Sequence, residues 1–236
     1  MDRDELLARY EATGGEQDFL EAKSLYEKAL TESPDDSQLH LKYGYLLECH
    51  SRSQLRHAVA QYERAIQLDP SNTKAHYQLI AARAGLLEPD QPISVYEHRL
   101  AGAPRDLDAH RLLAAAYLAG RQYAKAQRVI DDGLALAPDD ATLIENRGDV
   151  RAGTGDPDGA LADWRRALKL NPENLSSVYS SAFLLERQGR MLEAMDAWRY
   201  IIDWSEARGF SLETEWPKRE LQRLGASQPG REPERS

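Results

Sequence analysis

The sequence of 236 residues contains a single cysteine, Cys49. One thiol cannot form an internal disulfide or assemble a zinc site from cysteine ligands. Long apolar runs are also missing, since none approaches the roughly 20 residues that a membrane-spanning helix requires. The charged segment 1–5 is not followed by the apolar stretch of a secretion signal. These absences predict a cytoplasmic protein without membrane insertion and without a disulfide framework.

An excess of basic charge is lacking as well. The chain carries 30 Lys and Arg residues against 39 Asp and Glu residues, which gives a formal net charge of −9. Because proteins bind the phosphate backbone through clustered Lys and Arg, this balance predicts no nucleic-acid partner. The same acidity mildly favours a neutral or basic protein partner.

The common local signatures of catalytic sites do not occur. The sequence has no phosphate-cradling G-x-x-x-x-G-K-[ST], no metal-binding H-E-x-x-H and no nucleophile elbow G-x-S-x-G. The acids that recur regularly are explained by helix capping or by solvated helix faces. We therefore expect no enzyme, no catalytic residue, no cofactor and no resident metal.

Regularly spaced prolines are the main feature that the chain does have. Five of them are separated by 36, 34, 34 and 34 residues, as their positions show, and each is followed two residues later by Asp or Asn. Proline ends the preceding helix, and Asp or Asn caps the next one by accepting hydrogen bonds from its first turn. The pairs are Pro34 with Asp36, Pro70 with Asn72, Pro104 with Asp106, Pro138 with Asp140, and Pro172 with Asn174.

The residues before each proline indicate a packing helix. Ala160, Trp164 and Ala167 stand twelve, eight and five residues before the last of these prolines, and this small–large–small order recurs in the other copies. The spacing places the three residues on one helix face. In the third copy Pro92 and Arg99 replace the small residues, so we expect an irregular start to that helix and leave the packing between the third and fourth copies undefined.

Each packing helix is preceded by a first helix. In the fifth copy Ile144, Arg147, Gly148 and Arg151 take the positions of the pattern W-x2-L-G-x2-Y. This helix–turn–helix unit of 34 residues resembles the tetratricopeptide repeat family over residues 3–208. The resemblance implies an all-α fold, an α-solenoid of about six units that forms a right-handed superhelix with a C-terminal capping helix. A single unit cannot bury its apolar face, whereas a stack forms a continuous core.

The repeat spacing predicts an array over residues 1–210, a capping segment over 211–224 and a disordered tail over 225–236. The first unit is degenerate, with its turn at 13–15, and the second has two extra residues around 50–53. The expected units are 3–36, 37–72, 73–106, 107–140, 141–174 and 175–208.

The resemblance implies that the first helices line an extended concave surface that binds a protein or peptide segment. Positions on this surface that packing does not claim hold three tyrosines and a phenylalanine beside polar groups, which is typical of binding hot spots. The alternative is that these aromatic side chains fill space between adjacent first helices. The predicted groove residues are Leu41, Lys42, Tyr45, Lys74, Tyr77, Gln78, Arg111, Glu145, Asn146, Asp149, Tyr179, Phe183 and Arg187.

Some members of the family bind the C-terminal carboxylate of chaperones through a clamp of Lys or Arg with Asn. Arg111 lies at a clamp-like position, but Ala115 stands where the clamp needs Asn. Asn146 is followed in the next unit by Ser176 and Ser180 instead of basic residues. We therefore predict that this groove does not hold a chaperone tail.

Three histidines, His40, His76 and His110, occupy one position in consecutive units. A metal needs its ligands about 2 Å away, whereas helices in contact lie about 8–10 Å apart. Because one ion cannot bridge that spacing, we expect these side chains to fill the place of a large aromatic residue.

The leading functional interpretation is a protein-interaction adaptor or scaffold that binds in the concave groove. The alternative is an assembly chaperone or regulatory subunit of a multi-protein enzyme complex, which would use the convex face and the ends of the array. Formation of a homo-oligomer through the weakly patterned end of the first unit stays open.

Overall fold

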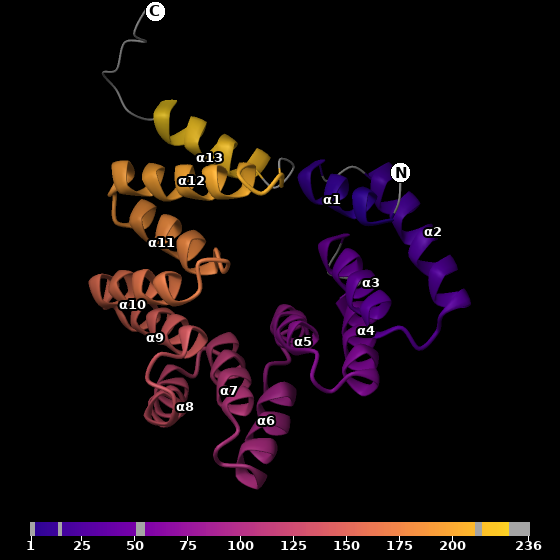
Figure 1. The fold of residues 1–236 in the computed structure, drawn as a ribbon, viewed down its shortest axis with the longest axis horizontal. Coiled ribbons are helices and arrows are strands. Elements are labelled where there is room, and N and C mark those ends of the chain that lie inside the picture. The colour runs from indigo at the N-terminus through magenta and orange to yellow at the C-terminus, as the bar shows by residue number, and fades with distance from the viewer. Residues whose placement is uncertain (1–2, 14–15, 51–54, 211–213, 227–236) are drawn as a thin grey trace, which may run out of the picture.

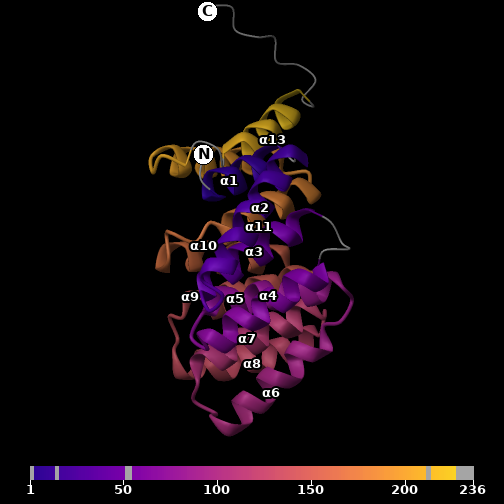
Figure 2. The same cartoon turned by 90° about the vertical axis from the view of Figure 1, so that its right-hand side faces the viewer.

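The computed structural model describes residues 3–13, 16–50, 55–210 and 214–226, and within these ranges the chain forms 13 α-helices. Successive helices pair and stack into an arc that brings α1, α12 and α13 to the same end of the molecule (Figures 1 and 2). The helices are α1 (Arg3–Thr13), α2 (Glu16–Glu32), α3 (Ser37–His50), α4 (Leu55–Leu68), α5 (Thr73–Gly85), α6 (Asp90–Gly102), α7 (Leu107–Ala119), α8 (Tyr123–Leu136), α9 (Ala141–Thr154), α10 (Pro157–Leu170), α11 (Ser176–Arg187), α12 (Met191–Glu206) and α13 (Glu215–Ala226).

Asp and Asn side chains start the first helix of the pairs. The side-chain oxygens of Asn72, Asp106 and Asp140 accept hydrogen bonds from the backbone N–H three residues later, at 3.0, 3.1 and 3.0 Å. These caps were predicted from the spacing and are confirmed. Asn174 differs, because α11 begins at Ser176, whose N–H donates to the Asn174 side chain at 3.0 Å.

The small–large–small residues form the interior of the stack, as predicted. Tyr62 in α4 and Trp164 in α10 are buried together with the alanines on either side of them, and Trp198 in α12 is buried between Ala194 and Ile201. In the fifth pair, the glycine Gly148 of α9 faces the large residue Trp164 of α10. A Cβ atom added at Gly148 would lie 2.5 Å from Nε1 of Trp164. Glycine is therefore required there by the close approach of α9 and α10.

The two helices of the third pair, α5 and α6, pack only loosely against each other. The contact between α5 and α6 is slight, whereas α5 packs against α4 and α6 packs against α7. Leu87, which lies between α5 and α6, has a φ of 64°, in the left-handed region that leucine rarely adopts. Pro92 falls within the first turn of α6, where proline is tolerated. The irregularity thus lies inside the third pair and not between the third and fourth pairs.

Helix α13 covers the end of the stack against α12. Leu224 is buried and Leu221 packs against the same core, so both leucines face the interior of the stack. The helix begins at Glu215 and runs two residues past the expected end of the capping segment, to Ala226. The rest of the expected tail, 227–236, lies outside the described residues. So do residues 14–15 of the first-unit turn predicted at 13–15 and residues 51–53 of the insertion predicted around 50–53.

Throughout the described ranges, no helix combines the length and the apolar character needed to cross a membrane.

Candidate functional site

The inner side of the arc contains a cavity of about 350 Å³, which we call the groove pocket. It lies among first helices that face the inside of the arc in Figure 1. Side chains of α5, α7 and α9 and of the residues that start α11 surround it. The lining residues are Tyr77, Ala115, Leu118, Thr142, Glu145, Asn146, Asp149, Asn174 and Ser176. Four of these, Tyr77, Glu145, Asn146 and Asp149, are among the predicted groove residues, and the structure brings them together.

Two carboxyl groups lie one helical turn apart on α9 and face the same pocket. Glu145 is only 8% exposed, and its Oε2 accepts a hydrogen bond from Nδ2 of Asn174 at 2.7 Å. Burial raises the pKa of Glu145, while hydrogen bonds from Ser176 and Asn174 oppose that rise. The pocket therefore contains a carboxyl group that is held by neutral donors.

Asp149 is the second carboxyl group, and its Oδ1 accepts a hydrogen bond from Nε1 of Trp164 at 3.0 Å. Burial, together with the negative charge of Glu145, raises the pKa of Asp149 to about 7. Both effects disfavour the ionised form, because the carboxylate loses its water and lies near a like charge. Asp149 can therefore gain or lose a proton near neutral pH.

Tyr77 reaches the pocket from α5. Its hydroxyl oxygen is buried and has no hydrogen-bond partner among the described residues, and burial raises the pKa of this hydroxyl. A buried polar atom without a partner costs about 1–3 kcal/mol. Asn146 is 7% exposed, and its Nδ2 lies 3.5 Å from the backbone oxygen of Arg111, at the limit of a hydrogen bond. The pocket thus holds polar groups whose hydrogen bonding is incomplete.

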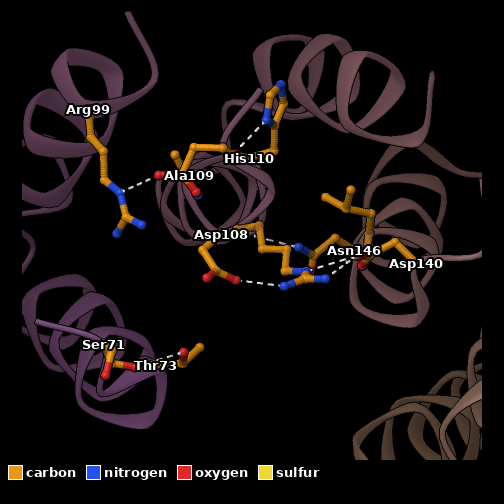
Figure 3. A network of polar contacts seen from close by, with 11 residues as sticks. Ser71, Thr73, Arg99, Asp108, Ala109, His110, Asp140 and Asn146 are labelled. Atoms are coloured by element: carbon orange, nitrogen blue, oxygen red, sulfur yellow. Dashed lines mark hydrogen bonds and ion pairs between the residues drawn. The ribbon is translucent and has the colours of Figure 1, made fainter. Parts of the chain in front are cut away.

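Arg111, the predicted residue at the clamp-like position, is held by two aspartates. Its Nε donates to Oδ2 of Asp140 at 2.9 Å, and its Nη1 donates to Oδ1 of Asp108 at 2.6 Å (Figure 3). The hydrogen bond to Asp140 is the main cause that raises the pKa of Arg111. Asp140 also caps α9. Arg111 therefore joins α7 to α9 through an ion pair that is already made.

The remaining predicted groove residues lie elsewhere on the arc. On α3, Lys42 and Tyr45 are partly buried, and on α5 Lys74 is exposed and Gln78 is partly buried. Leu41 is a correction, because it is only 4% exposed and packs within the hydrophobic core of the first helices. The Leu41 side chain therefore belongs to the hydrophobic core, whereas the sequence pattern predicts it on the concave surface of the groove.

Helix α13 occupies part of the expected groove at the C-terminal end. Trp216 stacks on the ring of Tyr179, with centroids 5.8 Å apart, and it lies 5.7 Å from the ring of Phe183. Phe183 keeps 45% of its surface exposed, and Arg187 at the end of α11 is also exposed. These contacts match the alternative that some of the inner aromatic residues fill space between helices.

Two contributors to the pocket were not predicted. The spacing identifies Asn174 only as a cap, yet its side-chain amide also donates a hydrogen bond to Glu145 in the pocket. The spacing identifies Trp164 only as a packing residue, yet its indole N–H donates a hydrogen bond to Asp149. Helix periodicity shows which face a residue occupies, but it does not show which polar atom of a packing residue meets a neighbouring helix.

The recurring histidines bind backbone. Nε2 of His40 lies 2.9 Å from the carbonyl oxygen of Pro34, and Nε2 of His76 lies 3.1 Å from that of Pro70. Nδ1 of His110 likewise lies 2.9 Å from a backbone oxygen at the start of α7. The rings of His40 and His76 therefore tie their helices to the preceding turn, whereas His110 bonds the N-cap residue of its own helix. Across the described ranges, no three His, Cys, Asp or Glu side chains gather so as to hold a metal ion.

Family models match two parts of the chain. A model described as TPR repeat matches residues 47–82, and one described as Tetratricopeptide repeat matches residues 145–204. No curated protein sequence shows a significant match to this chain.

Solved structures share the fold. A thermophilic TPR protein from Thermus thermophilus has a TM-score of 0.55 and 25% sequence identity, over 81% of this chain and 98% of that chain. Yeast Tom70 has a TM-score of 0.54 at 15% identity, over 87% of this chain and 43% of that one. The second likeness extends to the fold alone.

Proposed function

This chain belongs to the tetratricopeptide repeat family, and from that membership we propose that it is an adaptor whose concave groove binds a peptide segment of a partner protein. Repeats of this family generally form non-catalytic scaffolds for protein interaction. The groove pocket is the observation that carries the proposal, because it combines an open volume with buried polar groups whose hydrogen bonding is incomplete.

The chemistry of the pocket suits a polypeptide ligand. A peptide brings N–H and C=O groups that need partners when they leave water. The hydroxyl of Tyr77 and the amide of Asn146 can each donate and accept a hydrogen bond. Ala115 and Leu118 add apolar surface from α7. A segment that lies across α5, α7 and α9 would therefore meet polar and apolar groups together.

A second candidate function is an assembly chaperone or regulatory subunit that binds through the outer helices. A cavity of about 290 Å³ lies among α10, α11 and α12, and its apolar walls include Leu161, Leu168 and Leu185. Tyr200, which lines this cavity, is exposed on α12. This cavity offers a partner an apolar anchor site away from the groove pocket.

Affinity capture with two matched variants separates the candidates. Thr142→Trp places a bulky ring at the wall of the groove pocket, and Tyr200→Ala removes a ring from the outer cavity. Both positions keep solvent exposure, so both variants should melt within a few degrees of the wild type.

A partner that the Thr142→Trp variant loses and the Tyr200→Ala variant keeps would support binding in the groove. The opposite pattern would reject the groove and favour the outer face.

A further inference from the structure

Resting on the proposed groove function, we propose that the groove pocket receives the cationic side chain of a Lys or Arg residue in the partner segment. Glu145 and Asp149 supply the counter-charge. The hydroxyl of Tyr77 and the side-chain amide of Asn146 supply further hydrogen-bond acceptors. The ligand class is thus a peptide with a basic residue at the position that enters the pocket.

The first support is uncompensated charge. The lining residues include two acids and no Lys, Arg or His. Across the described ranges neither Glu145 nor Asp149 takes part in an ion pair, and their hydrogen-bond donors are neutral side chains. A buried carboxylate needs a counter-charge or a proton to be tolerated. A basic side chain from a partner supplies that charge.

The second support is that the nearby cation, Arg111, already has its own acidic partners. Arg111 on α7 is the base that could have neutralised the pocket from within the chain. It is instead bound by Asp140 and Asp108, at 2.9 and 2.6 Å. Both of its acidic partners lie outside the pocket lining. Its charge is therefore already matched, and the acids of the pocket stay available to a ligand.

The third support is the buried hydroxyl oxygen of Tyr77, which has no partner within the described part of the chain. Tyr77 extends from α5, whereas both acids are on α9, so a ligand in the pocket meets polar groups from two helices. An ammonium or guanidinium group carries several N–H donors, which can serve these acceptors together. A neutral side chain of similar size offers fewer donors and no charge.

The shape of the pocket also fits a long basic side chain. Its volume of about 350 Å³ accommodates the end of a Lys or Arg side chain. Ala115 and Leu118 form an apolar wall against which the methylene stem can pack while the charged end reaches the acids. A bare metal ion would leave that apolar wall without a partner.

Binding of a cation should release a proton. In the free protein the pKa of Asp149 is raised to about 7 by burial and by Glu145, and a bound cation would favour its ionised form. Glu145 is the charged group that acts on Asp149, and Tyr77 of α5 faces the same pocket, whereas α7 contributes the apolar Ala115 and Leu118 and α10 contributes the neutral indole N–H of Trp164. Affinity for a basic peptide should therefore fall by up to about tenfold from pH 8 to pH 6.

The test uses four pools of nine-residue peptides. The central residue is Lys, Arg, Gln or Glu, and the flanks are randomised among uncharged residues. Fluorescence anisotropy at pH 8 should show that the Lys or Arg pool binds at least about tenfold more tightly than the Gln pool. The Glu145→Gln, Asp149→Asn double variant should lose this preference.

A matched control removes the same charge elsewhere. Asp131 and Asp132 are exposed on α8, and their double change to Asn should leave the preference intact. Tyr77→Phe keeps the charge of the pocket and removes only the unpartnered hydroxyl, so it should weaken binding of the Lys pool without removing the preference. It also serves as a second variant if the double variant fails to fold.

The outcomes separate this proposal from the groove function. If the Lys and Arg pools bind no more tightly than the Gln pool, including the case in which no pool binds, the cation pocket is overturned. If the Glu145→Gln, Asp149→Asn variant still binds the Lys or Arg pool more tightly than the Gln pool, the net negative charge of the protein, and not this pocket, attracts the basic peptides. The cation pocket is then rejected as well. The groove function itself is decided by the capture experiment, whichever pool binds.

Discussion

At the scale of single residues, Asp149 shows how burial creates a group that titrates near neutral pH. Its carboxyl group lies inside the stack of helices, where it accepts a hydrogen bond from the indole N–H of Trp164. The same burial, with Glu145 one turn away, raises its pKa from 3.8 to about 7. In the unfolded chain the group would ionise at its ordinary pKa, so the fold itself carries the cost of ionising it.

The sign of the resulting pH dependence is defined. Between about pH 4 and pH 7 the folded state keeps a proton on Asp149 that the unfolded state loses, so the stability of the protein falls as pH rises. Asp149→Asn removes this loss. We expect it to raise the free energy of unfolding by up to about 4 kcal/mol at pH 8 and to have little effect at pH 4, as measured by urea denaturation.

Asp158→Asn is the control, because Asp158 is exposed at the start of α10. It should change stability only slightly at either pH. An equal effect of Asp149→Asn at pH 4 and pH 8 would contradict the raised pKa.

A second residue-scale feature is the glycine that lets two helices approach. A methyl group at Gly148 would meet Trp164 at 2.5 Å and the backbone oxygen of Ala160 at 3.2 Å. We expect Gly148→Ala to lower the free energy of unfolding by about 1–3 kcal/mol, as overpacking does. Gly102→Ala is the matched control, because nothing lies within 4 Å of an added Cβ there.

Thermal melts of the two glycine variants provide the measurement. The Gly102→Ala variant should melt at or slightly above the temperature of the wild type, since alanine favours helices. A Gly148→Ala variant as stable as the Gly102→Ala variant would show that α9 and α10 are not in close contact.

At the scale of helices, capping residues do more than begin a helix. Asn72 caps α5 through one hydrogen bond at 3.0 Å. Asp140 caps α9 at the same distance and also pairs with Arg111 of α7. The spacing of the prolines identifies both residues as caps, but it does not reveal the ion pair, because Arg111 stands 29 residues earlier in the chain.

This difference predicts two different costs of removal. Asn72→Ala should lower the free energy of unfolding by about 1 kcal/mol, the usual loss of a cap. Asp140→Ala should cost about 2–3 kcal/mol, because a partly buried Arg111 also loses a partner. Urea denaturation of the two variants decides this, and equal losses would indicate that the ion pair contributes nothing to stability.

At the scale of the whole molecule, the array is divided at its third helix pair. One hydrophobic core cluster extends from Leu6 to Ala82, and the next extends from Ile80 to Val150. Contact between α5 and α6 is slight, so the two parts are joined mainly where α5 meets α7. In stacked arrays each unit is stabilised by its neighbours, so a weak interface limits cooperativity.

We therefore predict two regions of different protection from hydrogen exchange. Amides of α7, α9 and α10, whose packing is extensive, should exchange more slowly than those of α5 and α6. Exchange measured by mass spectrometry on the intact chain tests this, and uniform protection from α3 to α12 would contradict a break at the third pair.

The sequence alone determined the repeat, the helix caps and the packing faces. Each of these depends on residues within one 34-residue unit, such as Ala160, Trp164 and Pro172, and local spacing reports them directly. Only the tertiary structure decided which inner residues form a pocket. Tyr77 and Glu145 meet because the stack curves, and Trp216 covers Tyr179 because α13 folds back. Curvature and end packing are sums over many interfaces, whereas each repeat specifies only its contacts with its neighbours.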